Sequence, residues 1–271
     1  MKKIIISVSV LFILFIITGE SNSRSNISLQ LLGGLSFPAG NFGQQVPLID
    51  TVRGVWPYQM KIAYSFGARG VLALKKDRKL NLTLGLNYSA FSNKQEVINI
   101  YATTGGGTSW TDKAGEGGNA TVTFHPKVNI ITLSAGVDYK FSPKETLDPF
   151  AGAEITANFF SGSFSFDQIS TGIYTPADLT STTRMGLQLT GGVEYRINEN
   201  FGLLGGVRVN FANLIGKTSA SKDIHTQNIE LSDKGINANG TTSSALNITY
   251  IGIFLGINLY LKPAEGPKGT M

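Results

Sequence analysis

The sequence predicts an all-β fold, a single antiparallel barrel of eight strands in up-and-down order. Three observations predict it. Eight segments alternate between apolar and small or polar residues with a period of two, and the connections between them alternate between long and short. In addition, only 15% of the 271 residues are charged, while 32 are glycine. A soluble domain usually carries about 25% charged residues and about 7% glycine. Part of the surface is therefore expected to face something other than water.

The composition also argues against several classes of protein. An apolar content of 42% is too high for a disordered chain. The chain has no cysteine, hence no disulfide and no thiolate metal site, and its two histidines, His125 and His225, argue against a histidine-rich metal site. The formal net charge of +5 is not gathered in a cluster of basic and aromatic residues, which argues against nucleic acid as a partner. No cofactor and no metal are expected.

The amino terminus has the three-part pattern of a secretory signal peptide. Met1, Lys2 and Lys3 form a short basic start, residues 4–17 are predominantly apolar, and small or polar residues follow up to Ser23. The apolar stretch is shorter than the roughly 20 residues that a transmembrane helix needs. We therefore expect residues 1–23 to be a signal peptide that is cleaved near Ser23.

The segment Arg184–Ile197 shows the alternation most clearly. One face carries Met185, Leu187, Leu189, Gly191, Val193, Tyr195 and Ile197, and the residues between them form a polar and glycine-rich face. Only a strand separates residues in this way. Seven further segments behave alike: Ile27–Phe37, Ile62–Lys75, Leu80–Phe91, Val128–Phe141, Pro149–Phe160, Phe201–Asn213 and Ile251–Leu261.

The connections between these segments are as informative as the segments themselves. Three are short, around Lys76–Arg78, Ser142–Asp148 and Asn198–Asn200. The other four are long: Pro38–Gln59, Ser92–Lys127, Ser161–Thr183 and Leu214–Ala245. Strict alternation places all short turns at one end of a meander and all long loops at the other, as in outer-membrane barrels. It indicates one domain.

Alternation alone does not tell which face is outside, because a soluble lipocalin-type barrel has the same period with its apolar face inward. The polar face consists mainly of small residues with few charges, whereas a water-exposed surface would carry more lysine and glutamate. Aromatic residues of the apolar face also gather at both ends of the strands, as in the two girdles of a transmembrane barrel. The girdle near the long loops comprises Phe37, Tyr64, Phe66, Tyr88, Phe159 and Phe211, and the other comprises Tyr139, Phe141, Tyr195 and Phe201. We therefore predict a transmembrane β-barrel with four long extracellular loops and short periplasmic turns.

Three segments carry a resemblance to a known family: Leu187–Arg196, Gly205–Phe211 and the closing Tyr250–Leu261. With these, the chain resembles the small OmpA/OmpX-like "outer membrane protein beta-barrel domain" proteins of Gram-negative bacteria. The resemblance implies an integral outer-membrane location and a last strand that is read by the barrel-insertion machinery. It implies a barrel over residues 24–262, and residues 263–271 are expected to form a short periplasmic tail that departs from the family pattern.

Five charged residues on the polar face are the candidates for a site inside the barrel: Arg69, Asp138, Glu154, Glu194 and Arg208. An unpaired charge in a low-dielectric lumen is costly, so each arginine is expected to pair with one of the acids. Such a network is either a structural plug or part of a narrow, ion-conducting path.

The long loops hold the remaining candidates. Four aromatic residues either contact a partner or rest on the barrel rim among lipid headgroups: Trp56, Tyr58, Tyr101 and Trp110. His125 is placed in the second long loop and His225 in the fourth, but no motif of a lipase, protease or acyltransferase accompanies them, so no enzymatic activity is expected.

The primary hypothesis for function is a structural or surface-interaction protein whose extracellular loops make the contacts. A narrow, porin-like transport pore is the alternative, and a surface hydrolase or acyltransferase is a third. The expected partners are outer-membrane lipid, lipopolysaccharide and the barrel-insertion machinery. Nothing in the sequence names a ligand of the loops.

Overall fold

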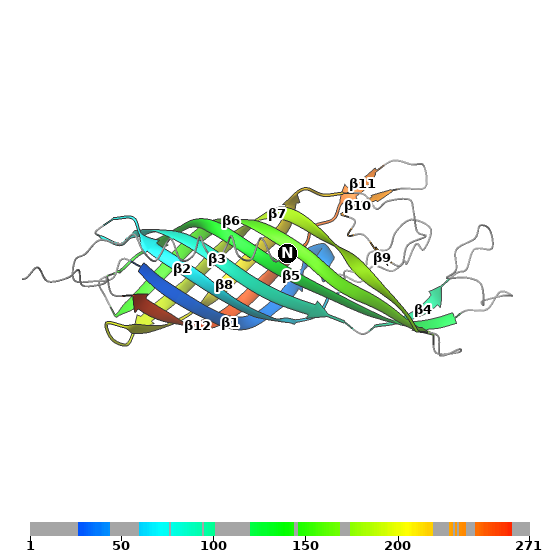
Figure 1. Ribbon diagram of the computed structural model, residues 1–271, viewed down its shortest axis with the longest axis horizontal. Helices are drawn as coiled ribbons and strands as arrows, with labels where there is room; N and C mark the ends of the chain where they lie inside the picture. The colour runs from blue at the N-terminus through cyan, green and yellow to red at the C-terminus, as the bar shows by residue number, and fades with distance from the viewer. Residues whose placement is uncertain are drawn as a thin grey trace, which may run out of the picture.

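A closed antiparallel barrel forms the body of the molecule (Figure 1). The computed structural model describes residues 27–43, 60–75, 77–93, 95–100, 120–143, 146–168, 174–218, 228–229, 231, 233–236 and 242–261. The barrel strands are β1 (Ile27–Ala39), β2 (Ala63–Ala73), β3 (Leu80–Ser92), β5 (Ala120–Lys140), β6 (Leu147–Gln168), β7 (Tyr174–Arg196), β8 (Phe201–Ile215) and β12 (Thr249–Leu261). Within the described residues, no helix is long and apolar enough to cross a membrane.

Each barrel strand pairs with the strand before it and the strand after it. The first and last strands close the ring, because β1 pairs with β12 from Ile27 opposite Leu261 to Ala39 opposite Thr249. Closure leaves no open sheet edge within the barrel, which is what a hydrocarbon environment requires of a spanning sheet. The predicted eight-stranded, up-and-down barrel is confirmed.

The molecule has its apolar face outside. On β12 the side chains of Ile253 and Leu255 are 53% and 73% exposed, whereas Phe254 and Asn258 between and beyond them point inward and are buried. Polar residues make up most of the buried side chains that the structure describes. The aromatic residues at both strand ends are also outward, with Tyr64 and Phe66 exposed at one end and Tyr139 and Phe141 at the other. This distribution matches a barrel surrounded by lipid.

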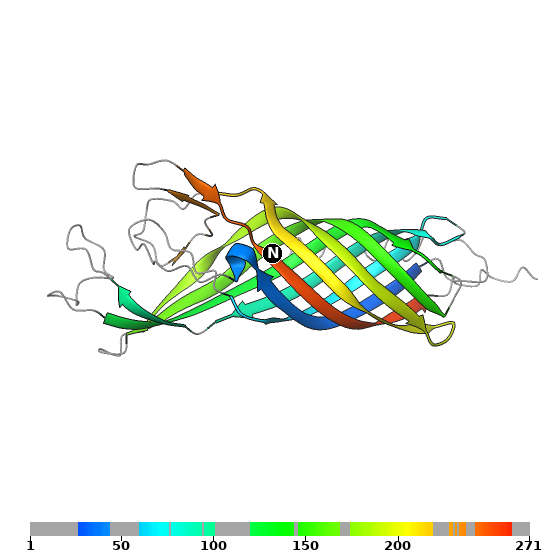
Figure 2. The same cartoon turned by 180° about the vertical axis from the view of Figure 1, so that it is seen from behind.

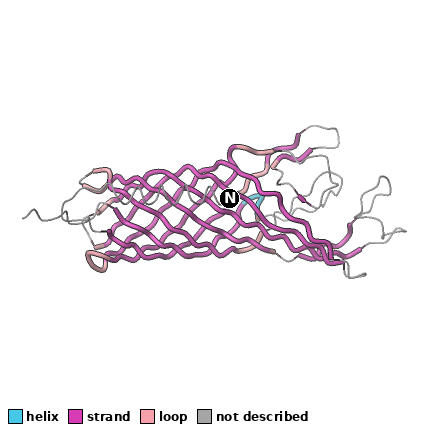
Figure 3. Tube along the Cα trace, in the orientation of Figure 1, coloured by secondary structure: helices cyan, strands magenta, loops and turns pink. Residues whose placement is uncertain are grey.

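Three strands continue well beyond the barrel wall. Strands β5, β6 and β7 remain paired to Val122 opposite Gln168 and Asp167 opposite Tyr174, and β4 (Gln95–Ile100) adds to the end of β5. They project as a narrow sheet from the end of the barrel opposite the short turns (Figures 1 and 3).

This sheet corrects the prediction of a loop at Ser161–Thr183, because only residues 169–173 separate β6 from β7. The predicted strand Val128–Phe141 is likewise longer than expected, because β5 starts at Ala120, inside the loop predicted at Ser92–Lys127.

Apolar residues do alternate in these extended segments, with Val122, Phe124 and Val128 on one face of β5 and Phe164 and Phe166 on one face of β6. Threonine and aromatic residues also have a high strand propensity, so the sequence contained a strand signal in this region.

The connection between β8 and β12 carries structure of its own. Strands β10 (Lys234–Ile236) and β11 (Thr242–Ala245) form a two-stranded sheet beside the barrel mouth, and β9 (Asn228–Ile229) pairs with β7 in parallel. A short 3₁₀ helix, η1 (Gly40–Phe42), follows β1 at the same end, as the reverse view shows (Figure 2).

Closure of the barrel depends on a close approach at Gly34 of β1. A Cβ atom at this position would collide with the carbonyl oxygen of Ile253 and the Cα of Phe254, both backbone atoms of β12. Gly191, which is on the outward face of β7, has nothing within 4 Å of such an atom.

Gly34→Ala is therefore expected to destabilise the barrel by about 1–3 kcal/mol, the usual range for overpacking, because β12 must shift at the seam. The measurement is equilibrium unfolding in urea with the protein in lipid vesicles, following the fraction that migrates as the folded band on unheated gels. Gly191→Ala is the matched control and should change the free energy of unfolding by less than about 0.5 kcal/mol. Equal effects of the two variants would contradict the close approach at the seam.

Candidate functional site

Arg69 on β2 is the centre of the charged group inside the barrel. Its Nη1 and Nη2 donate to the two carboxylate oxygens of Asp138 at 2.6 and 2.5 Å, and its Nε donates to Oε1 of Glu154 at 2.7 Å. All three side chains are at most 4% exposed. The two-pronged contact with Asp138 is the geometry that favours arginine over lysine at such a site.

Neutral side chains complete the coordination of Glu154. The hydroxyl of Thr83 donates to its Oε1 at 3.0 Å, and Nε2 of Gln188 donates to its Oε2 at 2.6 Å. On the other side, Arg69 Nη1 lies 3.4 Å from Oε1 of Gln30. The group joins β1, β2, β3, β5, β6 and β7 across the lumen, because every inward position on these strands faces the same narrow interior.

Arg208 on β8 is placed differently. It lies over the ring of Phe254, with 5.2 Å between its Cζ and the ring centroid, and its Nη1 donates to Oδ1 of Asn87 at 3.2 Å. Within the described residues it forms no ion pair, and its buried Nε has no hydrogen-bond partner. The prediction that each arginine would pair directly with an acid is wrong for Arg208. The oxygens of Glu154 are already occupied by Arg69, Thr83 and Gln188, and an aromatic face provides the remaining stabilisation.

Glu194 belongs to a second group, near the periplasmic end. Its Oε2 accepts a hydrogen bond from Nζ of Lys140 at 2.8 Å, and its Oε1 accepts one from the hydroxyl of Tyr260. Lys140 also lies 3.6 Å from Asp148. The sequence alone did not single out Lys140 or Asp148. Lys140 shares the inward face of β5 with Asp138, so the same two-residue period contained the signal.

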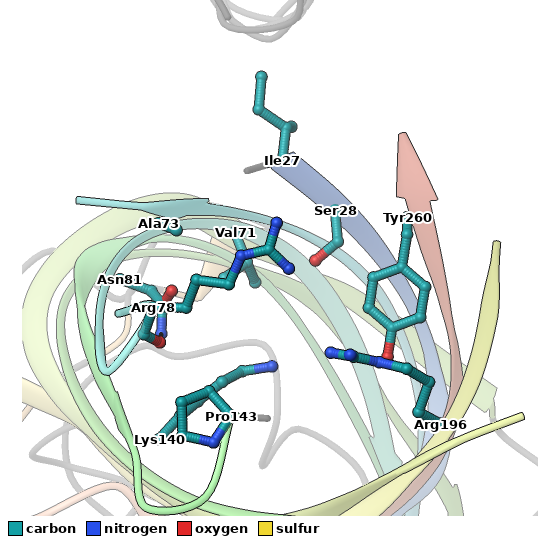
Figure 4. Close-up of a pocket in the computed structure, with 10 residues that line it drawn as sticks. All are labelled: Ile27, Ser28, Val71, Ala73, Arg78, Asn81, Lys140, Pro143, Arg196 and Tyr260. Atoms are coloured by element: carbon teal, nitrogen blue, oxygen red, sulfur yellow. Dashed lines mark hydrogen bonds between the residues drawn. The ribbon is translucent and has the colours of Figure 1, made fainter. Parts of the chain in front are cut away.

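The periplasmic opening lies beside this second group (Figure 4). A small pocket of about 30 Å³ there is lined by residues that include Arg78, Lys140, Arg196 and Tyr260. In the close-up, the cationic ends of Arg78, Lys140 and Arg196 extend toward the same opening. The guanidinium of Arg196 lies over the ring of Tyr260, 5.0 Å from its centroid.

Apolar side chains fill the extracellular end of the lumen. The rings of Phe42 and Phe91 pack edge to face at 4.8 Å, and those of Phe91 and Tyr250 at 5.2 Å. Leu231 and Ile248, from the connection between β8 and β12, belong to the same buried cluster. Residues outside the barrel strands thus help to close the extracellular end of the lumen.

Asp233 holds that connection in place. Its side chain is buried and accepts hydrogen bonds from Nε of Arg184 at 2.6 Å and from Nδ2 of Asn213 at 2.7 Å. Its backbone N–H donates to the carbonyl of Thr218 at 2.9 Å, and its own carbonyl accepts from the N–H of Leu246 at 2.8 Å. Asp233 lies within the predicted long loop Leu214–Ala245, and nothing in the sequence indicates its role, because its partners are remote in sequence.

The sequence model of a family described as Opacity family porin protein matches residues 81–233, more than half of the chain. The chain belongs to the Opacity porin family. This Opacity-family chain is an outer-membrane β-barrel protein, as the resemblance in its sequence implies. No curated protein sequence matches it.

Several solved structures are similar to this family member at low identity. Neisserial surface protein A is 14% identical with a TM-score of 0.43, over 89% of this chain and 100% of that one. Ail of Yersinia pestis in complex with a heparin analogue is 10% identical with a TM-score of 0.38, over 88% and 99%. The outer-membrane protease OmpT of Escherichia coli is 10% identical with a TM-score of 0.42, over 90% and 99%.

The histidines and loop aromatic residues that the sequence singled out are only partly within the described structure. His125, predicted in a long loop, lies within β5, and His225 is outside the described residues. The aromatic residues Trp56, Tyr58, Tyr101 and Trp110 are also outside them. Among the side chains that are described, no group of three or more histidine, aspartate or glutamate residues is arranged to hold a metal ion.

Arg69→Met is expected to lower the free energy of unfolding of this Opacity-family barrel by about 3–5 kcal/mol, because it leaves Asp138 and Glu154 as buried, uncompensated carboxylates. Urea unfolding in lipid vesicles is the measurement. Arg208→Met is the matched control, since it removes a buried guanidinium that has no acid partner among the described residues, and about 1 kcal/mol or less is expected. An Arg69 variant as stable as the Arg208 variant would contradict the central role of Arg69.

Proposed function

We propose that this protein acts at the cell surface, where the projecting sheet and the extracellular loops contact a ligand while the barrel anchors them. The observation that carries this proposal is the sheet of β4, β5, β6 and β7 that continues beyond the barrel wall. Strand β8 pairs with β7 only from Met185 onward, so residues 174–184 of β7 have no partner in β8 and extend past the ring of barrel strands. A membrane anchor alone would not need strands of 21 to 23 residues.

The second candidate is a narrow transport pore, which the polar lumen and the family description favour. Two features count against a pore as the main role. The ion pairs of Arg69 cross the middle of the lumen. The buried cluster that includes Phe42, Phe91 and Tyr250 fills its extracellular end. An eight-stranded barrel leaves little space beyond its own side chains. An enzymatic activity is not part of this proposal.

Trimming the projection tests the proposal. Ser163 of β6 is opposite Asp178 of β7, so residues 164–177 can be replaced by an Asn-Gly turn without changing the register of either strand. The trimmed protein should keep its folded gel migration, because the barrel pairs are untouched. Adhesion of intact cells that carry it, measured on immobilised matrix proteins and glycans, should fall to the level of cells without the protein.

Three results would contradict the surface role. The first is adhesion by the full-length protein no greater than that of control cells, and the second is adhesion unchanged by the trimming. The third is a steady conductance of the wild-type protein in planar bilayers, which would make the pore the better account of the interior.

A further inference from the structure

Two exposed lysines, Lys61 and Lys127, flank Ser92 of β3 at the extracellular end of the barrel. Lys61 lies two residues before the start of β2, and its backbone N–H donates to the carbonyl of Ser92 at 3.3 Å. Ser92 is in turn opposite Lys127 in the pairing of β3 with β5. Side chains opposite each other on neighbouring strands have Cβ atoms about 5 Å apart. The two ammonium groups can therefore reach the same anion, with the exposed Ser92 between them.

The strand segments that adjoin these lysines contain no acidic residue, and the first acid on the same ladder is Asp178 of β7, opposite Ser163. Residues 60–66, 86–93, 125–133 and 157–165, which form the surrounding parts of β2, β3, β5 and β6, contain no aspartate and no glutamate. Within the described residues neither lysine forms an ion pair. Ser163 faces Lys127 from β6 and adds a hydroxyl to the edge of the patch.

An apolar and aromatic surface lies directly below, on the lipid side. Tyr64 and Phe66 of β2 are 69% and 63% exposed, and Leu86 of β3 and Ile131 of β5 continue this surface toward the middle of the barrel. One step below Lys127, the hydroxyl of Tyr88 donates to Oδ1 of Asn129 at 3.0 Å. Tyrosines at this depth mark the level of lipid headgroups, so the lysines stand at headgroup height.

We propose that Lys61, Ser92 and Lys127 bind the headgroup phosphate of an outer-leaflet glycolipid of the lipid A type. The acyl chains of that lipid lie along Tyr64, Phe66 and Leu86. Two cations suit a phosphate dianion, and the hydroxyl and amide groups of Ser92, Ser163 and Asn129 suit the hydroxyls of a sugar headgroup. This site is independent of what the extracellular loops bind.

The test is a titration of the folded protein in detergent with diphosphoryl lipid A, with the bound fraction measured by native mass spectrometry. Because each surface lysine contributes about a fivefold factor to anionic lipid binding, Lys61→Gln combined with Lys127→Gln should weaken binding about 30-fold. The matched control is Lys75→Gln combined with Lys79→Gln, which removes the same charge from two exposed lysines at the periplasmic end. The control should bind as the wild type does, and all forms should show the folded gel migration.

Two further lipids, dephosphorylated lipid A and phosphatidylglycerol, test which chemical group of the lipid is recognised. Dephosphorylated lipid A should bind the wild type about as weakly as diphosphoryl lipid A binds the double variant. Equal binding by the two double variants would overturn the site, and equal binding of dephosphorylated lipid A would show that phosphate is not recognised. Equally tight, lysine-dependent binding of phosphatidylglycerol would overturn the assignment to a glycolipid.

Discussion

Closure of β1 on β12 is the constraint on which the rest of the structure depends. A sheet that faces hydrocarbon must satisfy every backbone N–H and C=O within itself, and a ring of strands is the way to do so. The register from Ile27 opposite Leu261 to Ala39 opposite Thr249 achieves this along the whole seam. Once the ring is closed, every second residue must face lipid and every other residue must face a narrow lumen.

The two groups of charges follow from that narrow interior. Arg69 lies between Asp138 and Glu154 in the middle, and Lys140 lies between Glu194 and Asp148 near the periplasmic end, so in each group one cation serves two acids. Register places Phe150 opposite Lys140 and Leu204 opposite Glu194, so apolar side chains of a second buried cluster stand next to this group. Arg208 lies over Phe254, which allows a guanidinium to stay inside without an acid of its own. The interior is thus filled by ion-paired side chains and aromatic rings.

The alternation in the sequence was enough to predict the barrel, because lipid on one side and a small lumen on the other impose a period of two. It could also place Arg69, Asp138 and Glu154 on the inward face. It could not say which of them meet, since Arg69 and Glu154 are 85 residues apart and their contact depends on the tilt of the strands. Lys140 was within reach of the same reasoning, as the next inward residue after Asp138.

Two parts of the molecule were not predicted from the sequence, for different physical reasons. The extension of β7 carries small polar residues on both faces, so no clear apolar period marks it as strand, whereas β6 keeps the alternation of phenylalanine with serine up to Phe166. Asp233 is buried only because Arg184, Asn213 and Thr218 surround it, and none of these contacts is local. Both lie outside the membrane, where lipid no longer imposes a pattern.

The central claim is that the apolar face of each strand meets lipid, and β12 allows the most direct measurement of it. The chain has no cysteine, so single cysteines for spin labels can be introduced at residues 250–258 in turn. In lipid vesicles, collision with dissolved oxygen should be high at 251, 253, 255 and 257 and low at the positions between them. A flat profile, or one with the opposite phase, would contradict the barrel's orientation toward lipid.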